Sequence, residues 1–428
     1  MFYFVQGAFV MNKFLSIFTL FHLSILGALE VVPEKHYYTV GETAVFNISL
    51  GGKRGAKIID VKIHGNREDS RELRLKTDDS GKAKLEVPLY KPGFICVQIT
   101  DNGKDAFGGI AVDKEKILPA RQKPVEFEAF WSKIKAELDH LAMQYELNEI
   151  PAKSGFKAYE VKLILGGEGK DVDAVLTMPE KSVPGRSAAI ALFHGHGIDR
   201  VSPVYKKDVI VISVNPLPVK HDGKCGVTIR DPKGKYYMYR HWGADDLEKN
   251  SFVAMFRRNY RALQFLKSLP EWDQRTLIVY GASQGGGQAL AAAGMDPQVT
   301  FCGALVPALC NHGGFDAGAE SGWPRYHETE AYQNDPDKSL KVIDFVDAAF
   351  FAANIRDAEV FLSAGFIDRT CVPSSVYAAY NVIPAEKKEM HDELCGGHQT
   401  RKKAYEKLYK LVDEHIKRMQ SGFNSVQQ

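Results

Sequence analysis

The chain has 428 residues, of which 55 are Lys or Arg and 53 are Asp or Glu, so its formal net charge is only +2. This balance argues against a nucleic-acid partner and against binding to an anionic membrane surface. Hydrophobic residues make up 45% of the chain and charged residues 25%, which is typical of a folded globular protein. The length predicts two or three domains, and the six cysteines show neither zinc spacing nor the density of a disulfide scaffold.

Residues 1–28 have the pattern of a secretory signal peptide. Lys13 precedes an apolar stretch over residues 14–26, and two small residues follow it. The ten residues before Met11 are a poor fit to the start of a signal, so the choice between Met1 and Met11 stays open. The alternative is a single membrane anchor, for which the apolar stretch is short. We therefore expect a secreted or periplasmic protein with no membrane contact beyond export.

Residues 30–115 predict a small all-β domain of the immunoglobulin-like sandwich type. Short runs of alternating apolar and polar residues are separated by turn-forming clusters, and the runs lie at 44–50, 57–63, 71–75, 84–89 and 94–100. This spacing is typical of an antiparallel sandwich. Its role stays open between a packing or spacer module and a sugar-binding one.

A second domain is predicted over residues 120–422, after a linker that contains Pro119 and Pro124. It begins with a predicted helix over 127–147, and residues 159–178 predict a hairpin. Near-continuous apolar runs then indicate parallel strands buried on both faces, at 188–193, 209–214, 276–280, 301–305 and 359–363. Helical segments separate or follow these strands, at 252–269, 287–294 and 400–419. The alternation predicts the α/β class with a doubly wound, mostly parallel sheet.

The strongest functional motif is a G-x-S-x-G pattern centred on Ser283. A predicted strand runs directly into Gly281-Ala-Ser-Gln-Gly285, and an Ala-rich helix follows. This context is that of the nucleophile elbow of an α/β-hydrolase, in which small residues permit a sharp turn that exposes the serine Oγ. The backbone N–H of Gln284, at the start of the helix, would then face a developing oxyanion.

A serine hydroxyl is a weak nucleophile, so it needs a base and a carboxylate that orients the base. Asp368 follows the predicted strand 359–363 through a short turn, and His398 lies in a glycine-rich loop before the last helix. The rival acid Asp357 precedes the same strand and therefore falls at the opposite edge of the sheet. The rival base His391 and its neighbour Asp392 fall in a charged stretch that we expect to be solvated.

The loop His194-Gly195-His196 directly follows the predicted strand 188–193. In a serine hydrolase this loop supplies a second oxyanion donor through a backbone N–H. The alternative is the beginning of a metal site, which needs further His and Asp ligands at other strand ends.

Together these motifs resemble carbohydrate esterase family seven, the acetyl xylan esterase and cephalosporin C deacetylase group. The resemblance covers residues 127–419 and rests on Glu126-Phe-Glu-Ala-Phe-Trp131, Phe193-His-Gly-His196, Tyr236-Tyr-Met-Tyr-Arg240, Gly281-Ala-Ser-Gln-Gly-Gly286, Gly365-Phe-Ile-Asp368, Cys371-Val-Pro-Ser-Ser375 and Gly397-His398.

The resemblance implies that Ser283 is the nucleophile, His398 the general base and Asp368 the carboxylate that orients it. The backbone N–H groups of His196 and Gln284 would form the oxyanion hole. The implied reaction is hydrolysis of O-acetyl esters on xylo-oligosaccharides or related small acetylated compounds, through an acetyl-enzyme and with neither a metal nor a cofactor.

The chain departs from the family pattern at three places. Asn215-Pro-Leu-Pro218 stands where the family usually has Arg-Gly-Gln, His398-Gln399 replaces His-Glu, and His194-Gly-His196 replaces His-Gly-Tyr. These changes leave the three catalytic candidates intact and bear on the loops around the acyl group, and hence on the preferred ester. Relatives in this family often form hexamers, and the sequence leaves homo-oligomerisation of this chain open.

Two other functions stay open at this point. One is another α/β-hydrolase activity, on other carboxylic esters or on peptides. The other is a carbohydrate-binding protein with a degenerate hydrolase domain, which the intact serine, aspartate and histidine speak against. The aromatic residues of segment 236–242 suit either a sugar cleft or core packing, and Cys371 and Cys395 are candidates for a disulfide.

Overall fold

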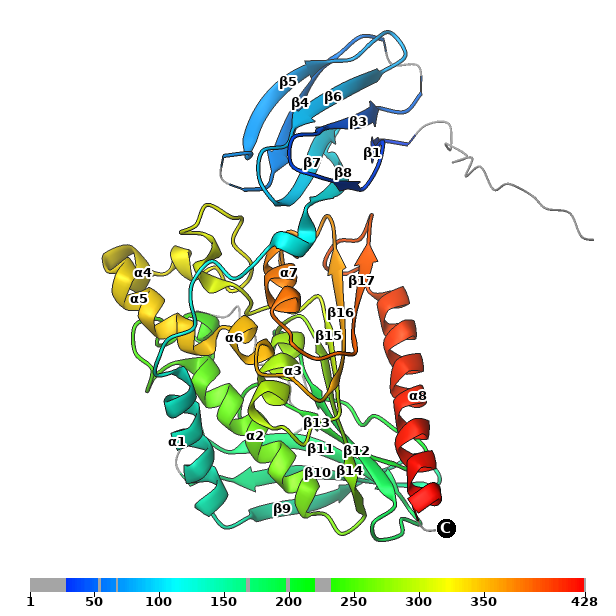
Figure 1. Cartoon of the computed structure of the whole chain (residues 1–428), viewed down its shortest axis with the longest axis vertical. Helices are drawn as coiled ribbons and strands as arrows, with labels where there is room; N and C mark the ends of the chain where they lie inside the picture. Colours follow the sequence, from blue (N-terminus) through cyan, green and yellow to red (C-terminus); the bar gives the residue numbers. More distant parts are fainter. Residues whose placement is uncertain are drawn as a thin grey trace, which may run out of the picture.

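The computed structural model describes residues 28–52, 55–66, 68–166, 170–197, 201–219 and 232–426. Apart from Ala28, the predicted signal peptide therefore lies outside the described residues. A small β-sandwich lies at one end of a larger α/β unit, above the carboxyl ends of strands β16 and β17 (Figure 1).

The amino-terminal sandwich, residues 30–112, consists of two sheets around one apolar core. Their strand orders are β1-β3-β6 and β2-β8-β7-β4-β5, and every pair except β2-β8 is antiparallel. The strands are β1 (Glu30–Pro33), β2 (Tyr37–Tyr38), β3 (Thr43–Ser49), β4 (Ile58–His64), β5 (Arg71–Lys76), β6 (Lys82–Pro88), β7 (Gly93–Asp101) and β8 (Lys104–Val112). Alternation places Ala44, Phe46 and Ile48 of β3 in the core. The five predicted strands are present, whereas β8 was not predicted because Gly108 and Gly109 interrupt its alternation.

The α/β unit is built on a nine-stranded sheet of order β17-β16-β15-β14-β12-β13-β11-β10-β9. The six strands from β17 to β13 in this order are parallel, and β11, β10 and β9 are antiparallel. The strands are β9 (Gln144–Ile150), β10 (Phe156–Ile164), β11 (Val172–Pro179), β12 (Ser187–Phe193), β13 (Val209–Val214), β14 (Trp272–Ala282), β15 (Phe301–Leu305), β16 (Glu359–Gly365) and β17 (Lys388–Glu393). The predicted mostly parallel sheet is confirmed.

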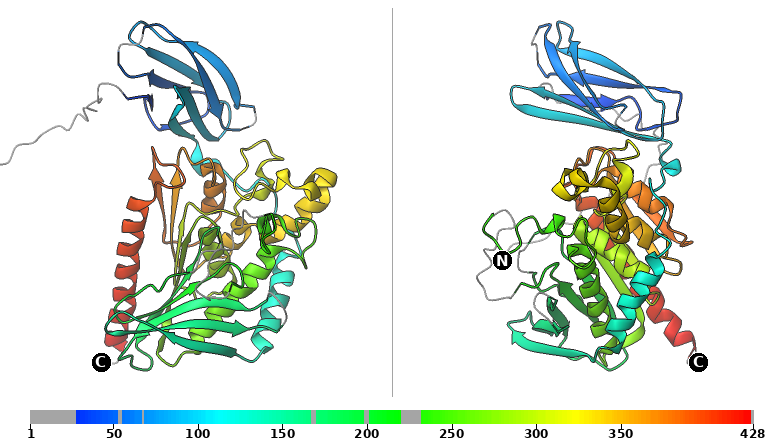
Figure 2. Two further views of the ribbon diagram at one scale, coloured as in Figure 1. Left: turned by 180° about the vertical axis from the view of Figure 1, so that it is seen from behind. Right: turned by 90° about the vertical axis from the view of Figure 1, so that its left-hand side faces the viewer.

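Helices cover both faces of this sheet (Figures 1 and 2). They are α1 (Phe127–His140), α2 (Ser251–Ser268), α3 (Gln284–Met295), α4 (Glu330–Asn334), α5 (Pro336–Ile343), α6 (Ala348–Ala352), α7 (Pro373–Asn381) and α8 (Lys402–Val426). Helix α8 packs against one face, where Leu408 and Val412 contact a core that includes Ile278 and Phe361. Burial on both faces explains why the central strands are continuous apolar runs.

Two predicted elements differ from the observed ones. The helix expected over 127–147 ends at His140, because Leu141 is extended and residues 144–150 form β9 beside β10. The local helical period did not reveal this nonlocal pairing. Residues 388–393, expected to be a solvated stretch, form the edge strand β17, and all six are half-buried.

The sandwich contacts the α/β unit at the ends of β16 and β17. Phe366, just after β16, meets the rings of Tyr37 and Phe94 edge to face. Asp392 of β17 accepts hydrogen bonds from the hydroxyls of Tyr37 and Tyr377, and Lys114 pairs with the same carboxylate. Asp392 was therefore wrongly expected to be solvated, since these partners leave its side chain only 12% exposed.

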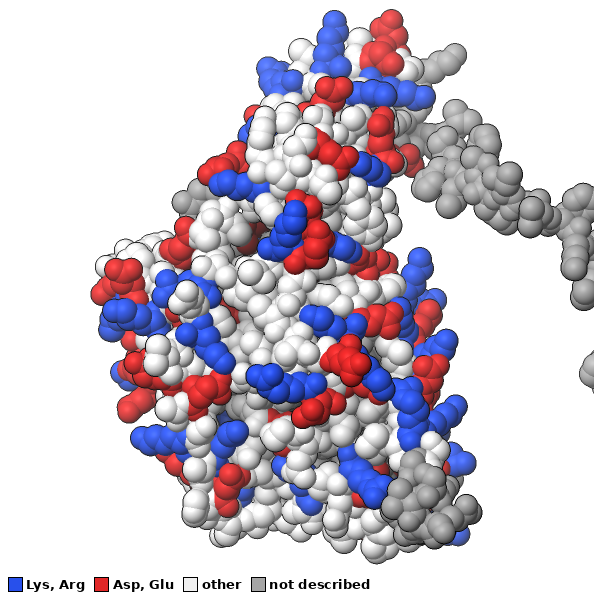
Figure 3. All heavy atoms as spheres, in the orientation of Figure 1, with Lys and Arg blue, Asp and Glu red and all other residues white. Residues whose placement is uncertain are grey.

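On the face shown in Figure 3, acidic and basic side chains are intermingled over both the sandwich and the α/β unit. This distribution agrees with the balanced composition of the chain. Within the residues that the structure describes, no helix is long and apolar enough to span a bilayer.

Candidate active site

Ser283 lies on a tight turn between strand β14 and helix α3. Its backbone has φ 58° and ψ −125°, a strained conformation for a residue with a side chain. A Cβ added to Gly285 would lie 2.2 Å from the carbonyl oxygen of Phe193, so only glycine permits this approach of the turn to strand β12. The turn is held because the Ser283 N–H donates to the Leu305 carbonyl over 2.9 Å. The sequence therefore forms the elbow that exposes the serine Oγ at the carboxyl edge of the sheet.

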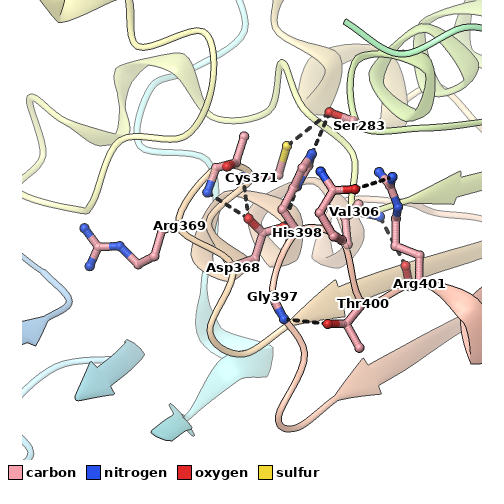
Figure 4. Close-up of polar contacts among 12 residues, drawn as sticks. Ser283, Val306, Asp368, Arg369, Cys371, Gly397, His398, Thr400 and Arg401 are labelled. Carbon is pink, nitrogen blue, oxygen red and sulfur yellow. Dashed lines mark hydrogen bonds and ion pairs between the residues drawn. The ribbon is translucent and has the colours of Figure 1, made fainter. Parts of the chain in front are cut away.

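His398 lies between Ser283 and Asp368 (Figure 4). The distance from its Nε2 to the Ser283 Oγ is 3.0 Å, and the distance from its Nδ1 to Oδ2 of Asp368 is 2.8 Å. With the Asp368 carboxylate accepting from Nδ1–H, the other ring nitrogen carries a lone pair and accepts from the serine hydroxyl. The three predicted residues thus form one continuous hydrogen-bonded chain.

The Asp368 carboxylate is held from behind by the backbone. Its Oδ1 accepts from the N–H groups of Thr370 and Cys371, at 2.8 and 2.9 Å, and its side chain is fully buried. The Cys371 thiol lies 3.9 Å from the Ser283 Oγ. Burial raises the pKa of this thiol well above its usual range, so it remains a protonated neighbour of the serine.

The loop after β12 lies against the first turns of α3. The side-chain amide of Gln288 donates to the His194 carbonyl over 2.9 Å, and Gly195 approaches the carbonyl of Ala282. The Tyr239 hydroxyl donates to Oε1 of Gln284 over 2.6 Å and accepts from the Gly197 N–H. Because Gln284 is the first residue of α3, its N–H has no partner within the helix. This arrangement can stabilise an oxyanion beside Ser283.

A cavity of about 680 Å³ opens over the serine. Its described lining combines polar residues, among them Thr370, Gln399 and Arg401, with apolar ones such as Phe193 and Trp323. The His196 ring packs against Trp323 and Tyr239, at centroid distances of 5.1 and 5.4 Å. The volume suits a small ligand that is partly enclosed.

The rival residues lie elsewhere. His391 is on β17, where its Nε2 is 2.9 Å from a carboxylate oxygen of Glu393, and Asp357 lies in the turn before β16 at the opposite edge of the sheet. Cys371 and Cys395 are both free thiols, so the candidate disulfide does not form.

The aromatic residues of segment 236–242 differ in burial. Tyr236 and Tyr239 are buried in the core, whereas Tyr237 and Trp242 are 40% and 39% exposed. None of the four is among the described residues that line the cavity. Packing is therefore the structural role of this segment.

Sequence reasoning missed Trp323, Arg401 and the positioning role of Tyr239. Trp323 has no recognisable motif around it. Its backbone N–H donates to the backbone carbonyl of Thr370, two residues after Asp368, and this bond brings it to the site. Arg401 is three residues after His398 in a segment that the sequence describes only as the start of an amphipathic helix. In the described part of the chain, no group of three or more His, Cys, Asp or Glu residues is arranged to hold a metal ion.

The order of the sheet, the helices on both faces and the serine elbow define an α/β-hydrolase fold. The family model described as acetyl xylan esterase (AXE1) matches residues 113–413. The curated protein "Acetyl esterase Axe7A" of Xylanibacter ruminicola is 26% identical over 326 residues, which cover 73% of this chain and 72% of that protein.

Two solved structures share the fold. An acetyl xylan esterase from Paenibacillus sp. R4 is 23% identical with a TM-score of 0.61, over 70% of this chain and 98% of that one. Acetyl xylan esterase 1 from Thermoanaerobacterium sp. JW/SL YS485 is 22% identical with a TM-score of 0.59, over 71% and 97%. The chain belongs to the acetyl xylan esterase family and is a carboxylic ester hydrolase.

Proposed function

We propose that the protein is a serine esterase that removes O-acetyl groups from small carbohydrates, such as xylo-oligosaccharides, through an acetyl-enzyme. The observation that carries this proposal is the unbroken hydrogen-bonded chain from Asp368 through His398 to Ser283. The acetyl group and the carbohydrate class follow from the family to which the chain belongs.

In the proposed reaction, the Ser283 Oγ attacks the ester carbonyl while Nε2 of His398 takes its proton. Asp368 stabilises the imidazolium that forms, because its buried carboxylate faces Nδ1–H at 2.8 Å. Collapse of the tetrahedral intermediate transfers the proton to the sugar oxygen and leaves an acetyl group on Ser283. A water molecule, deprotonated by His398, then attacks this acetyl-enzyme and releases acetate.

The backbone N–H groups of Gln284 and His196 are the proposed oxyanion donors. Gln284 follows the nucleophile directly, and the loop of His196 lies against helix α3 through the bond from Gln288 to His194. Donors placed in advance where negative charge develops lower the barrier by about 3 kcal/mol each.

The mechanism is tested by acetate release from acetylated xylo-oligosaccharides and from p-nitrophenyl acetate. We expect Ser283→Ala to abolish both activities, while Ser268→Ala, a serine at the far end of α2, retains them. Equal thermal unfolding of the two variants shows that the loss is chemical. Undiminished turnover by Ser283→Ala would refute the proposed nucleophile.

The acyl preference separates this proposal from other esterase or peptidase activities. A series of p-nitrophenyl esters from acetyl to octanoyl should show the highest kcat/KM for acetyl. A preference for long acyl chains or for peptide substrates would contradict a deacetylase, and sugar binding without any ester turnover would indicate a binding protein.

We further propose that residues 30–115 and 120–422 are two domains joined through Pro119 and Pro124, and that segment 1–28 directs export. Limited proteolysis should cleave near the linker and leave two stable fragments. Amino-terminal sequencing of the exported protein should begin near Leu29. A protein retained in the cytoplasm with an intact amino terminus would contradict the export signal.

A further inference from the structure

The active-site cavity contains an arginine that the proposed reaction does not use. Arg401 lines the cavity together with Ser283 and His398, and Figure 4 shows its side chain on the same side of Asp368 as His398, with another side chain between the guanidinium and the imidazole. It lies only three residues after His398 in the chain, directly before helix α8. Its position is therefore set by the same loop that places the base.

Arg401 is the one Lys or Arg among the described residues that line the cavity, and that lining includes no Asp or Glu. The acid Asp368 lies behind His398 with its side chain fully buried, so it does not face the cavity. A ligand in the cavity therefore meets one full positive charge and no described negative charge.

The Arg401 guanidinium has no carboxylate partner within the described part of the chain. Its side-chain hydrogen bond runs from Nη2 to the neutral amide oxygen of Gln399, at 3.1 Å. By contrast, Arg121 pairs with Asp344 and Arg369 pairs with Glu320. Most of the donors of Arg401 remain available to a ligand.

The positive charge of Arg401 acts near Ser283. Burial raises the pKa of the Cys371 thiol, whose sulfur is 3.9 Å from the Ser283 Oγ, and the charge of Arg401 partly offsets this rise. The first turn of α8 contains no acidic residue, and cations at the amino end of a helix are electrostatically unfavourable. A bound anion would offset this cost.

We propose that Arg401 binds a carboxylate on the acetylated sugar, so that the preferred substrates are O-acetylated oligosaccharides that contain a uronic acid. This inference rests on the proposed esterase function and narrows its substrate class. A planar guanidinium binds a carboxylate through two parallel hydrogen bonds, which a neutral sugar cannot provide. Thr370 and Gln399 also line the cavity and can supply polar contacts for sugar hydroxyls.

The test compares two probes that differ only at C6, a mono-O-acetylated methyl glucopyranosiduronic acid with a carboxylate there and the matched mono-O-acetylated methyl glucopyranoside with a neutral hydroxymethyl group. We expect kcat/KM of the wild-type enzyme to be about tenfold higher for the uronate than for the neutral sugar at low ionic strength. The ratio should be smaller in 0.5 M salt, because the screening length there is only roughly 4 Å. Arg401→Gln should bring the ratio of the two values close to one, and Arg401→Lys should retain part of the preference.

Lys402→Gln is the matched control. Lys402 is the next residue in the chain and carries the same charge, but its side chain is 90% exposed and does not line the cavity. It should keep the wild-type ratio. A wild-type ratio near one, or an unchanged ratio in Arg401→Gln, would overturn the carboxylate assignment, and so would a stronger preference for a sulfated acetyl sugar. If p-nitrophenyl acetate and both sugars are not hydrolysed at all, the esterase function itself fails.

Discussion

Phe94 of the sandwich and Phe366 of the α/β unit pack edge to face, with ring centroids 5.1 Å apart and an interplanar angle of 77°. Phe366 is two residues before Asp368, and the intervening Ile367 N–H donates to the carbonyl of Gly396, in the loop that bears His398. The sandwich therefore contacts the loop of Asp368, which is hydrogen-bonded to the loop of His398.

The first prediction concerns Gly109 of the sandwich, whose backbone lies against that of Phe366. A Cβ added to Gly109 of β8 would lie 2.5 Å from the carbonyl oxygen of Phe366, so Gly109→Ala must displace one of the two segments. We expect kcat for p-nitrophenyl acetate to fall about tenfold, because small displacements of catalytic groups are costly.

The neighbouring Gly108 offers a control on the same strand. A Cβ there would lie 2.6 Å from the carbonyl oxygen of Val31, inside the sandwich. Gly108→Ala should lower the unfolding temperature of the sandwich and leave kcat close to the wild-type value. Equal kcat in the two variants would show that the acid loop does not depend on this contact.

A second prediction concerns the Tyr239 hydroxyl, which joins Gln284 to Gly197 across the proposed oxyanion hole. Tyr239→Phe removes both hydrogen bonds and keeps the buried ring. We expect kcat to fall about tenfold with little change in KM, because positioning of the oxyanion donors matters most in the transition state.

Tyr236→Phe is the control, since its hydroxyl donates to the carbonyl of Pro218 over 2.6 Å and does not bond to Gln284. The measurement is kcat and KM of Tyr239→Phe and Tyr236→Phe on the same acetyl ester. An equal loss in both would assign the effect to general packing of the aromatic segment.

Ser283 and Asp368 could be predicted from sequence because each follows a predicted strand through a short, glycine-containing turn, and parallel strands end at one edge of the sheet. His398 was predicted from its glycine-rich loop before the last helix alone, because the strand that precedes it, β17, was not predicted. Tyr239 could not be predicted in this way, because its partner Gln284 is 45 residues away and the contact depends on how two loops pack. For the same reason, strand β9 was mistaken for helix: its pairing with β10 is nonlocal.

The contacts between the sandwich and the α/β unit also could not be predicted from the sequence. The strands of the sandwich follow from period-two alternation, but the contacts of Tyr37 and Lys114 with Asp392 join segments that are more than 250 residues apart. The charged residues of β17 alone predict a solvated surface, because the sequence does not show that the sandwich covers part of this strand.

A third prediction distinguishes the acid from its sequence rival. Asp368→Asn keeps the shape of the side chain but removes the charge and the acceptor that fixes the His398 tautomer. We expect kcat to fall about 10⁴-fold, as when the orienting carboxylate of a serine triad is replaced by an amide. Asp357→Asn, at the opposite edge of the sheet, should retain full activity. Comparable activity of the two variants would contradict the assignment of Asp368.

The last prediction concerns stability at low pH and rests on His312. Its half-buried ring lies against Tyr326, with centroids 5.0 Å apart, and its Nε2 is buried; this desolvation lowers the pKa of His312 from 6.5 to about 3. The unfolded chain therefore binds a proton between these values that the folded chain does not. The stability associated with His312 is present above pH 6.5 and is lost progressively as the pH falls toward 3.

Asp347 acts in the opposite direction over part of this range. Burial raises its pKa from 3.8 to about 6, although it accepts backbone hydrogen bonds from Asn311 and His312, so the folded state gains protons first as the pH falls. A measurement on the wild-type protein alone mixes the two effects. A comparison with a His312 variant cancels the Asp347 contribution, because the backbone N–H that bonds to Asp347 is retained.

Urea unfolding of the wild type and of His312→Asn at pH 7 and pH 5 isolates the histidine. Between these pH values, the wild type should lose about 2 kcal/mol more unfolding free energy than the variant, given one proton excluded from the folded state. His140→Asn, at an exposed position on α1, should follow the wild type at both pH values. An equal loss in wild type and His312→Asn would mean that the His312 ring takes up its proton without unfolding.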